Sequence, residues 1–147
     1  MNNQETIIRE NYIATELLKI ALLQQDGILV GKFAWKIFAN AQKLKDLEKQ
    51  IKYYRIALKG FKDAQNEAGH AKTWKNLLKA GKLAKTETLL PLQAEIWEDY
   101  GNFLLQQQTP TSKVAKYFEK ARKIYIKLNN TEKVAVLDHY IQSIGTQ

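Results

Sequence analysis

The sequence predicts an all-α protein, and three observations support this prediction. Apolar residues recur at three- and four-residue spacing along almost the whole chain, as they do on one face of a helix. Only two prolines and seven glycines interrupt the 147 residues. Strict alternation of apolar and polar residues between hairpin turns is absent, so strands are not expected. The composition, 45% hydrophobic and 26% charged, is that of a globular domain, and we expect one domain over 1–147.

Seven segments have this helical periodicity, and short polar or glycine-containing breaks separate them. They are expected at 4–24, 28–42, 45–65, 68–84, 87–107, 111–128 and 131–144. Asp26 and Gly27 end the first segment, residues 66–69 end the third, and the Thr-Pro-Thr-Ser run at 109–112 caps the start of the sixth. Pro91 either lies in the first turn of the fifth helix, where a missing amide proton costs least, or marks its true beginning.

Two hexapeptides in different predicted helices share one pattern. Trp-Lys-Ile-Phe-Ala-Asn at 35–40 and Trp-Glu-Asp-Tyr-Gly-Asn at 97–102 both read aromatic, two residues, aromatic, small residue, asparagine. A small residue lets a neighbouring helix approach closely, so Ala39 and Gly101 are expected at close contacts between helices. Aromatic residues at helical spacing are usually core residues. The tryptophans expected to be buried are Trp35, Trp74 and Trp97.

Each hexapeptide is followed by a helix in which an aromatic residue precedes an alanine by three positions, for example Phe118 before Ala121. This arrangement resembles the tetratricopeptide repeat, a helix–turn–helix unit with a Trp, a Leu-Gly pair and an Ala…Phe…Ala pattern, and the best copy covers about 97–128. The resemblance implies antiparallel pairs stacked as a short right-handed superhelix, with 1–27 as an N-terminal helix and 28–147 as repeat helices. A plain helical bundle is the alternative fold.

The inventory of reactive side chains is small. The chain has no cysteine, which excludes disulfides, thiolate nucleophiles and cysteine-based metal sites. Because His70 and His139 are the only histidines and no glycine-rich phosphate loop occurs, we expect neither a catalytic site nor a metal or cofactor. The N-terminus lacks a basic start, and Lys19 interrupts the apolar stretch 17–23, so we expect a cytoplasmic protein without a membrane span.

The family resemblance implies that the first helix of each repeat lines a groove. Lys36 and Glu98 hold the same place in the two hexapeptides, as do Asn40 and Asn102, and an asparagine amide both donates to and accepts from a peptide backbone. The candidate groove residues are Lys36, Asn40, Asn76, Glu98 and Asn102. The alternative is that the asparagines merely lie on a solvated turn of helix.

One family feature is only partly present. Members that bind chaperones hold a C-terminal carboxylate with a clamp, and Lys36, Asn40 and Asn76 match three of its places. The two remaining places should hold Lys and Arg, whereas this sequence has Glu95 and Asp99, which would repel a carboxylate. We therefore do not expect a carboxylate clamp.

Lysines form stripes on several predicted helices, in a chain of formal net charge +8. Their three- and four-residue steps place each set on one side of its helix. The candidate basic face comprises Lys72, Lys75, Lys79 and Lys82 on the fourth helix and Lys113, Lys116, Lys120 and Lys123 on the sixth. A single stripe of this kind is usually a solvated face, but stacked like charges are relieved by an anionic partner. Because Lys far outnumbers Arg, contact with nucleic acid would be to the backbone, without sequence preference.

These observations lead to two hypotheses about function. The first is a non-catalytic adaptor that binds an acidic or mixed-charge segment of another protein in a helical-repeat groove. The second is a small basic helical subunit that binds a nucleic-acid backbone, within a ribonucleoprotein. The sequence does not indicate the oligomeric state.

Overall fold

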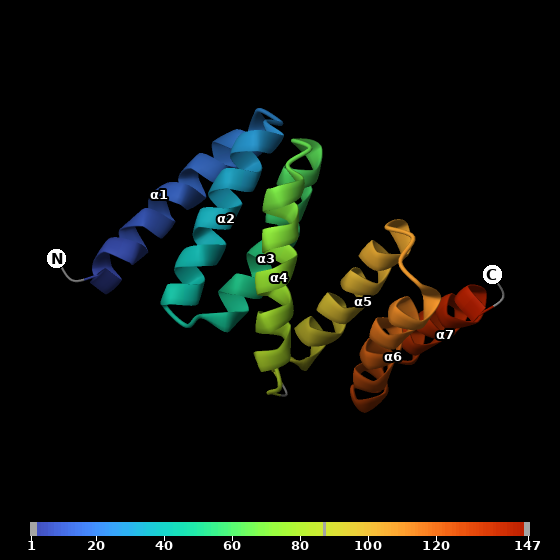
Figure 1. Ribbon diagram of the computed structural model, residues 1–147. Helices are drawn as coiled ribbons and strands as arrows, with labels where there is room; N and C mark the ends of the chain where they lie inside the picture. Colours follow the sequence, from blue (N-terminus) through green and yellow to red (C-terminus); the bar gives the residue numbers. More distant parts are fainter. Residues whose placement is uncertain (1–2, 87, 146–147) are drawn as a thin grey trace. The chain divides into compact units, whose positions relative to one another are not determined.

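The computed structural model of the chain describes residues 3–86 and 88–145, and in these residues it contains seven α-helices and no strand (Figure 1). The helices are α1 (Asn3–Leu23), α2 (Gly27–Lys43), α3 (Leu47–Asp63), α4 (Glu67–Leu83), α5 (Leu90–Gln106), α6 (Thr111–Lys127) and α7 (Thr131–Gly145). The predicted all-α fold class is therefore confirmed. The predicted start of the fifth helix, residue 87, lies outside the described residues, and α5 begins at Leu90 with Pro91 in its first turn. Pro91 thus lies in the first turn of that helix, where a missing amide proton costs least.

Five of the turns between consecutive helices contain a residue with positive φ, and the turn from α2 to α3 is an example. Lys45 has a positive φ of 58°, and its N–H donates to the carbonyl of Gln42 at 3.1 Å. The next N–H, of Asp46, donates to the carbonyl of Ala41 at 2.9 Å, which completes a Schellman ending. The Asp46 carboxylate then accepts from the N–H of Lys49 at 3.1 Å and caps the new helix.

The same turn recurs along the chain at a regular spacing. Residues with positive φ are Gln25, Lys45, Gln65, Gln108 and Asn129. The first three lie 20 residues apart, and the two helices between them, α2 and α3, each have 17 residues. Asp or Asn follows the positive-φ residue in four of these turns and caps the next helix. The turn before α6 differs, because Pro110 holds its N-cap position and no side chain caps the helix. The predicted capping by the run at 109–112 is therefore wrong, although the helix begins at Thr111 as predicted.

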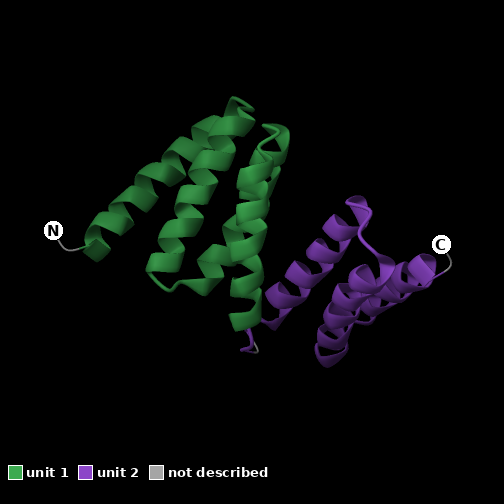
Figure 2. Cartoon of the chain, in the orientation of Figure 1, with its two compact units in different colours: residues 1–83 green, residues 84–147 purple. Residues whose placement is uncertain are grey.

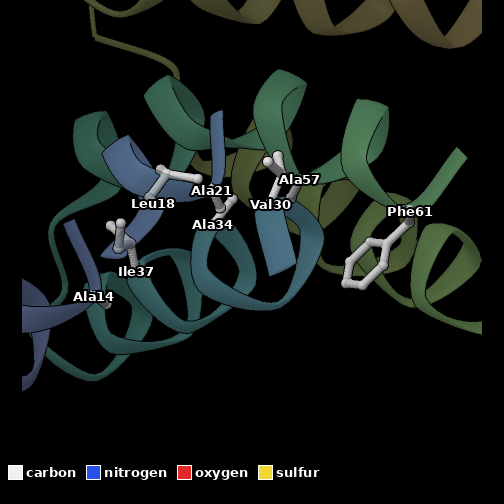
Figure 3. Packing of buried hydrophobic residues seen from close by; sticks show 8 residues of the cluster. All are labelled: Ala14, Leu18, Ala21, Val30, Ala34, Ile37, Ala57 and Phe61. Carbon is white, nitrogen blue, oxygen red and sulfur yellow. The ribbon is translucent and has the colours of Figure 1, made fainter. Parts of the chain in front are cut away.

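The chain divides into two compact units, unit 1 up to Leu83 and unit 2 from Ala84 onward (Figure 2). In unit 1, helices α1, α2 and α3 share an apolar core, shown in Figure 3. Its members are Ala14, Leu18, Ala21, Val30, Ala34, Ile37, Ala57 and Phe61. Alanines and glycines predominate where helices touch, so the helix axes lie close together.

The closest approach in unit 1 joins the backbones of α2 and α3. A Cβ placed on Gly60 would lie 2.4 Å from the backbone nitrogen of Gly31, so only glycine fits there. Ala39, which we expected at a close helix contact, is only partly buried and does not form this seam. The sequence pattern identified the correct helix, but the small residue that matters in α2 is Gly31.

In unit 2, α5 packs on α6 and α6 packs on α7. Gly101 lies against the ring of Phe118, whose nearest atoms would be 2.7 Å from an added Cβ. The predicted close contact at Gly101 is therefore confirmed. Phe118 and Ala121, the aromatic residue and alanine of the repeat pattern, are both fully buried.

Two of the three tryptophans are buried as predicted. Trp74 and Trp97 keep only 6% and 4% of their surfaces exposed. Trp35 differs, because it is only partly buried, and its ring stacks on Phe38 with centroids 5.3 Å apart. The Nζ of Lys72 lies 4.9 Å from the Trp35 ring centroid. Trp35 therefore contributes to a surface as well as to the core.

Candidate functional site

Two of the candidate groove residues are engaged by helix α1. Lys36 Nζ lies 3.3 Å from Glu10 Oε2, and the Asn40 amide nitrogen lies 3.5 Å from the same oxygen. The Asn40 side chain is completely buried, and its Oδ1 has no hydrogen-bond partner among the residues described. The buried Asn40 side chain therefore cannot contact a bound protein segment. The Lys36 side chain is half-exposed at the surface and can still contact one.

Glu98 serves a structural network within unit 2. The residue is 9% exposed, and its carboxylate accepts hydrogen bonds from the Tyr125 hydroxyl at 3.1 Å and from Lys133 Nζ at 3.1 and 3.3 Å. Burial and the neighbouring carboxylate both raise the pKa of Tyr125 far above its ordinary value of 10.0, so the phenol stays protonated and donates. These contacts fasten α5 to α6 and α7, and the carboxylate faces inward.

The two asparagines of the hexapeptides do not occupy equivalent places. Asn40 lies five residues before the positive-φ residue Lys45, whereas Asn102 lies six residues before its counterpart Gln108. This difference of one residue turns the two side chains to different sides of their helices, because each residue rotates the helix by about 100°. Asn40 is buried and Asn102 is half-buried. The expected equivalence was wrong by one position.

Asn76 connects the second and fourth helices. Its Oδ1 accepts from the Gln42 side-chain amide at 3.3 Å, and its own amide donates to the Lys72 carbonyl at 2.9 Å. Both groups of the Asn76 amide are thus used inside unit 1. Asn40, Asn76 and Glu98 are therefore each engaged within their own unit. Lys36, Asn40 and Asn76 belong to unit 1, and Glu98 and Asn102 belong to unit 2.

The predicted basic residues lie at the surface. Lys72, Lys75, Lys79 and Lys82 are all exposed, on the side of α4 opposite its buried residues Thr73, Trp74, Leu77, Ala80 and Gly81. On α6, Lys113, Lys116 and Lys123 are exposed as well. Lys120 is half-buried, and its Nζ lies 5.2 Å from the Trp97 ring centroid and 5.1 Å from that of Tyr117. Lys120 therefore packs on rings more than it projects into solvent.

A surface hollow of about 460 Å³ lies between α1 and α2, and the sequence interpretation missed it. We call it the α1–α2 hollow. It is lined by Glu10, Ile13, Ala14 and Leu17 of α1 and by Lys32, Phe33, Trp35 and Lys36 of α2. Carbon atoms supply most of its wall, and the charged groups belong to the three residues Glu10, Lys32 and Lys36. A hollow of this size and composition is suited to apolar side chains.

The sequence contains a signal for this hollow. Helix α1 buries a stripe that includes Ala14, Leu18 and Ala21. Beside that stripe runs a second one at the same helical spacing, made of Ile13, Leu17 and Ile20, which remain 56%, 38% and 49% exposed. A helix with two apolar stripes and one neighbour keeps one stripe uncovered. Contiguous exposed apolar side chains of this kind mark interaction sites.

No described helix combines the length and apolarity needed to cross a membrane. Within residues 3–86 and 88–145, no group of three or more His, Asp or Glu side chains is placed to hold a metal ion. Comparison of the chain with protein-family models, with curated proteins and with solved structures found no match.

Proposed function

We propose that this chain is a non-catalytic binding module that holds a segment of another protein in the α1–α2 hollow. The observation that carries this proposal is the hollow itself, with the uncovered stripe of Ile13, Leu17 and Ile20 beside it. Covering these side chains removes apolar surface from water, which is the main driving force for association between proteins. The proposal keeps the predicted adaptor class and moves the site from the predicted groove to the first two helices.

The aromatic residues of the hollow support the same conclusion. Trp35 and Phe33 both contribute to its wall, and each is only partly buried. Aromatic side chains that remain accessible beside aliphatic ones are typical of the residues that dominate binding energy at protein interfaces.

Photo-crosslinking in the native host tests the proposal. A photoreactive phenylalanine analogue at Leu17, inside the hollow, should form a covalent adduct with a discrete protein. Leu23 is the matched control, because it lies on the same helix and is 86% exposed but does not line the hollow. The proposal is contradicted if Leu17 yields no protein adduct, or if both positions yield the same adducts in equal amount.

The lysines of α4 favour a second candidate function, binding of a nucleic-acid backbone. Lys72, Lys75, Lys79 and Lys82 are all exposed, and α4 contains no acidic residue after Glu67. Random single-stranded RNA and double-stranded DNA are suitable probes, read by fluorescence polarisation. A backbone binder should lose affinity steeply with salt, and changing these four lysines to glutamine should weaken binding. If no binding is detected at low salt, this function is excluded.

A further inference from the structure

We infer that the occupant of the α1–α2 hollow is an acidic amphipathic helix of a partner protein. This inference rests on the proposed function and adds the chemistry of the partner. The apolar side chains of the partner helix would fill the hollow, and its carboxylates would lie against the exposed lysines of α2.

The length of the hollow fits two turns of helix. Along α1 its lining runs from Glu10 to Leu17, a rise of about 10 Å at 1.5 Å per residue. Apolar residues at positions i and i+7 of a partner helix have the same separation, and one at i+4 lies between them. A partner helix with this spacing would place its apolar stripe along the hollow, as helices do in apolar grooves.

The charged residues around the hollow favour a partner with negative charge. Lys32, Lys36 and Lys43 lie on one side of α2, and this helix contains no acidic residue at all. The only acidic residue in the lining is Glu10, whose carboxylate is paired with Lys36. Lys32, on the rim, has no acidic partner among the residues described. A partner that brings carboxylates supplies the missing charge.

The same observations argue against other occupants. A symmetric contact between two copies would add a second set of the same lysines, while the only carboxylate of the lining, Glu10, is already paired with Lys36. A membrane surface favours a convex apolar face, whereas Leu17, Phe33 and Trp35 line a concave one. A nucleic-acid backbone gains nothing from an aliphatic wall, and it prefers arginine for bidentate phosphate contacts.

Designed peptides test the inference with the full chain. The first probe is a short helical peptide with leucine at i, i+4 and i+7 and glutamate on both flanks of that stripe. Two matched peptides carry glutamine or lysine at the flanking positions. Binding is read from tryptophan fluorescence, because Trp35 lines the hollow, and the variant Trp35→Phe should abolish most of the signal. The glutamate peptide should bind best and the lysine peptide worst. Equal binding of all three peptides would overturn the inference.

Two pairs of variants locate the binding site. Lys32→Glu reverses a charge on the rim, and Lys113→Glu makes the same change at an exposed residue of α6. Lys32→Glu should weaken binding of the glutamate peptide roughly threefold to tenfold, and Lys113→Glu should leave it nearly unchanged. Leu17→Ser should also weaken it, whereas Leu23→Ser should not. If the two variants of either pair changed the affinity for the glutamate peptide equally, the peptide would not bind in the hollow.

Further outcomes separate this inference from the proposed function. Mass spectrometry of the adduct at Leu17 identifies the partner segment, and a basic or neutral segment would overturn the inference while leaving the function intact. Tighter binding of the chain to vesicles of anionic lipid, or to random RNA, than to the glutamate peptide would assign the surface to that ligand. Concentration-dependent self-association that is lost in Leu17→Ser would assign it to a second copy.

Discussion

Replacing Gly60 by alanine probes the tightest of the glycine contacts between helices in the described residues. The added Cβ would lie 2.4 Å from the Gly31 nitrogen and 2.7 Å from the Gly31 Cα. Both are backbone atoms, so no side chain can rotate away. Ordinary contact begins at 3.4 Å, and α2 and α3 would therefore have to separate by about 1 Å. A gap of 0.5–1 Å already forfeits roughly a quarter to a half of the dispersion energy of the atoms that face it.

The magnitude follows from two opposing contributions. Alanine in the interior of a helix is favoured over glycine by about 1 kcal/mol. Overpacking a close seam costs about 1–3 kcal/mol and more where backbone blocks relaxation. We expect a net destabilisation of about 2 kcal/mol, which lowers the melting temperature of a unit of this size by about 8–16 °C.

Thermal and urea denaturation followed by circular dichroism measures this change. Gly145→Ala is the matched control, because nothing lies within 4 Å of the Cβ that it adds, and we expect its stability to be unchanged or slightly higher. If Gly60→Ala were as stable as the unaltered chain, the cost of overpacking would be no larger than the gain in helix propensity. The close approach of α2 and α3 would then be refuted.

Three further predictions concern other contacts. Gly101→Leu should overpack the ring beside it and cost about 1–3 kcal/mol; an unchanged melting temperature would count against the seam. Glu98→Ala should cost about 1–2 kcal/mol because Tyr125 and Lys133 lose their acceptor, and a double-mutant cycle with Tyr125→Phe should show coupling. Burial lowers the pKa of His70 below 6.5, so the unfolded chain binds its proton more readily, and stability should fall as the pH drops through and below about 6.5. His70→Asn should flatten that loss, measured as the urea midpoint against pH; an identical pH profile would exclude the effect.

The helices were predictable from the sequence because their signals are local. Apolar spacing and the polar breaks at Asp26 and at residues 66–69 depend on residues a few positions apart, and all seven helices lie close to their predicted ranges. The cap at Asp46 was not predicted, because the third helix was expected to begin at residue 45. The two errors at Asn40 and Trp35 have a different origin. Asn40 is buried because α1 folds over α2, a contact between residues 30 positions apart. Periodicity along one helix shows which residues share a side but not which neighbour covers them.

The hollow was harder to predict for a related reason. Its walls come from two helices, and its volume depends on how far apart these lie and on which side chains face the gap. The stripe of Ile13, Leu17 and Ile20 is visible in the sequence, yet it resembles an ordinary core stripe until the buried side of α1 is known. The lysine stripes were easier to predict, since seven of the eight candidate lysines are exposed. Lys120 is the exception, because it is half-buried against the rings of Trp97 and Tyr117.

Because Gly31 contacts Gly60, the two helices that form the walls of the hollow differ in how firmly they are held in unit 1. Helix α2 is held backbone to backbone against α3, whereas α1 rests on α2 through small side chains such as Ala14 and Ala21. Amide protons of α1 should therefore exchange with solvent through local opening well before those of α2. A ligand in the hollow bridges both helices, so its binding should slow exchange in α1 far more than in α2. Binding at this site is thus coupled to the opening of the first helix.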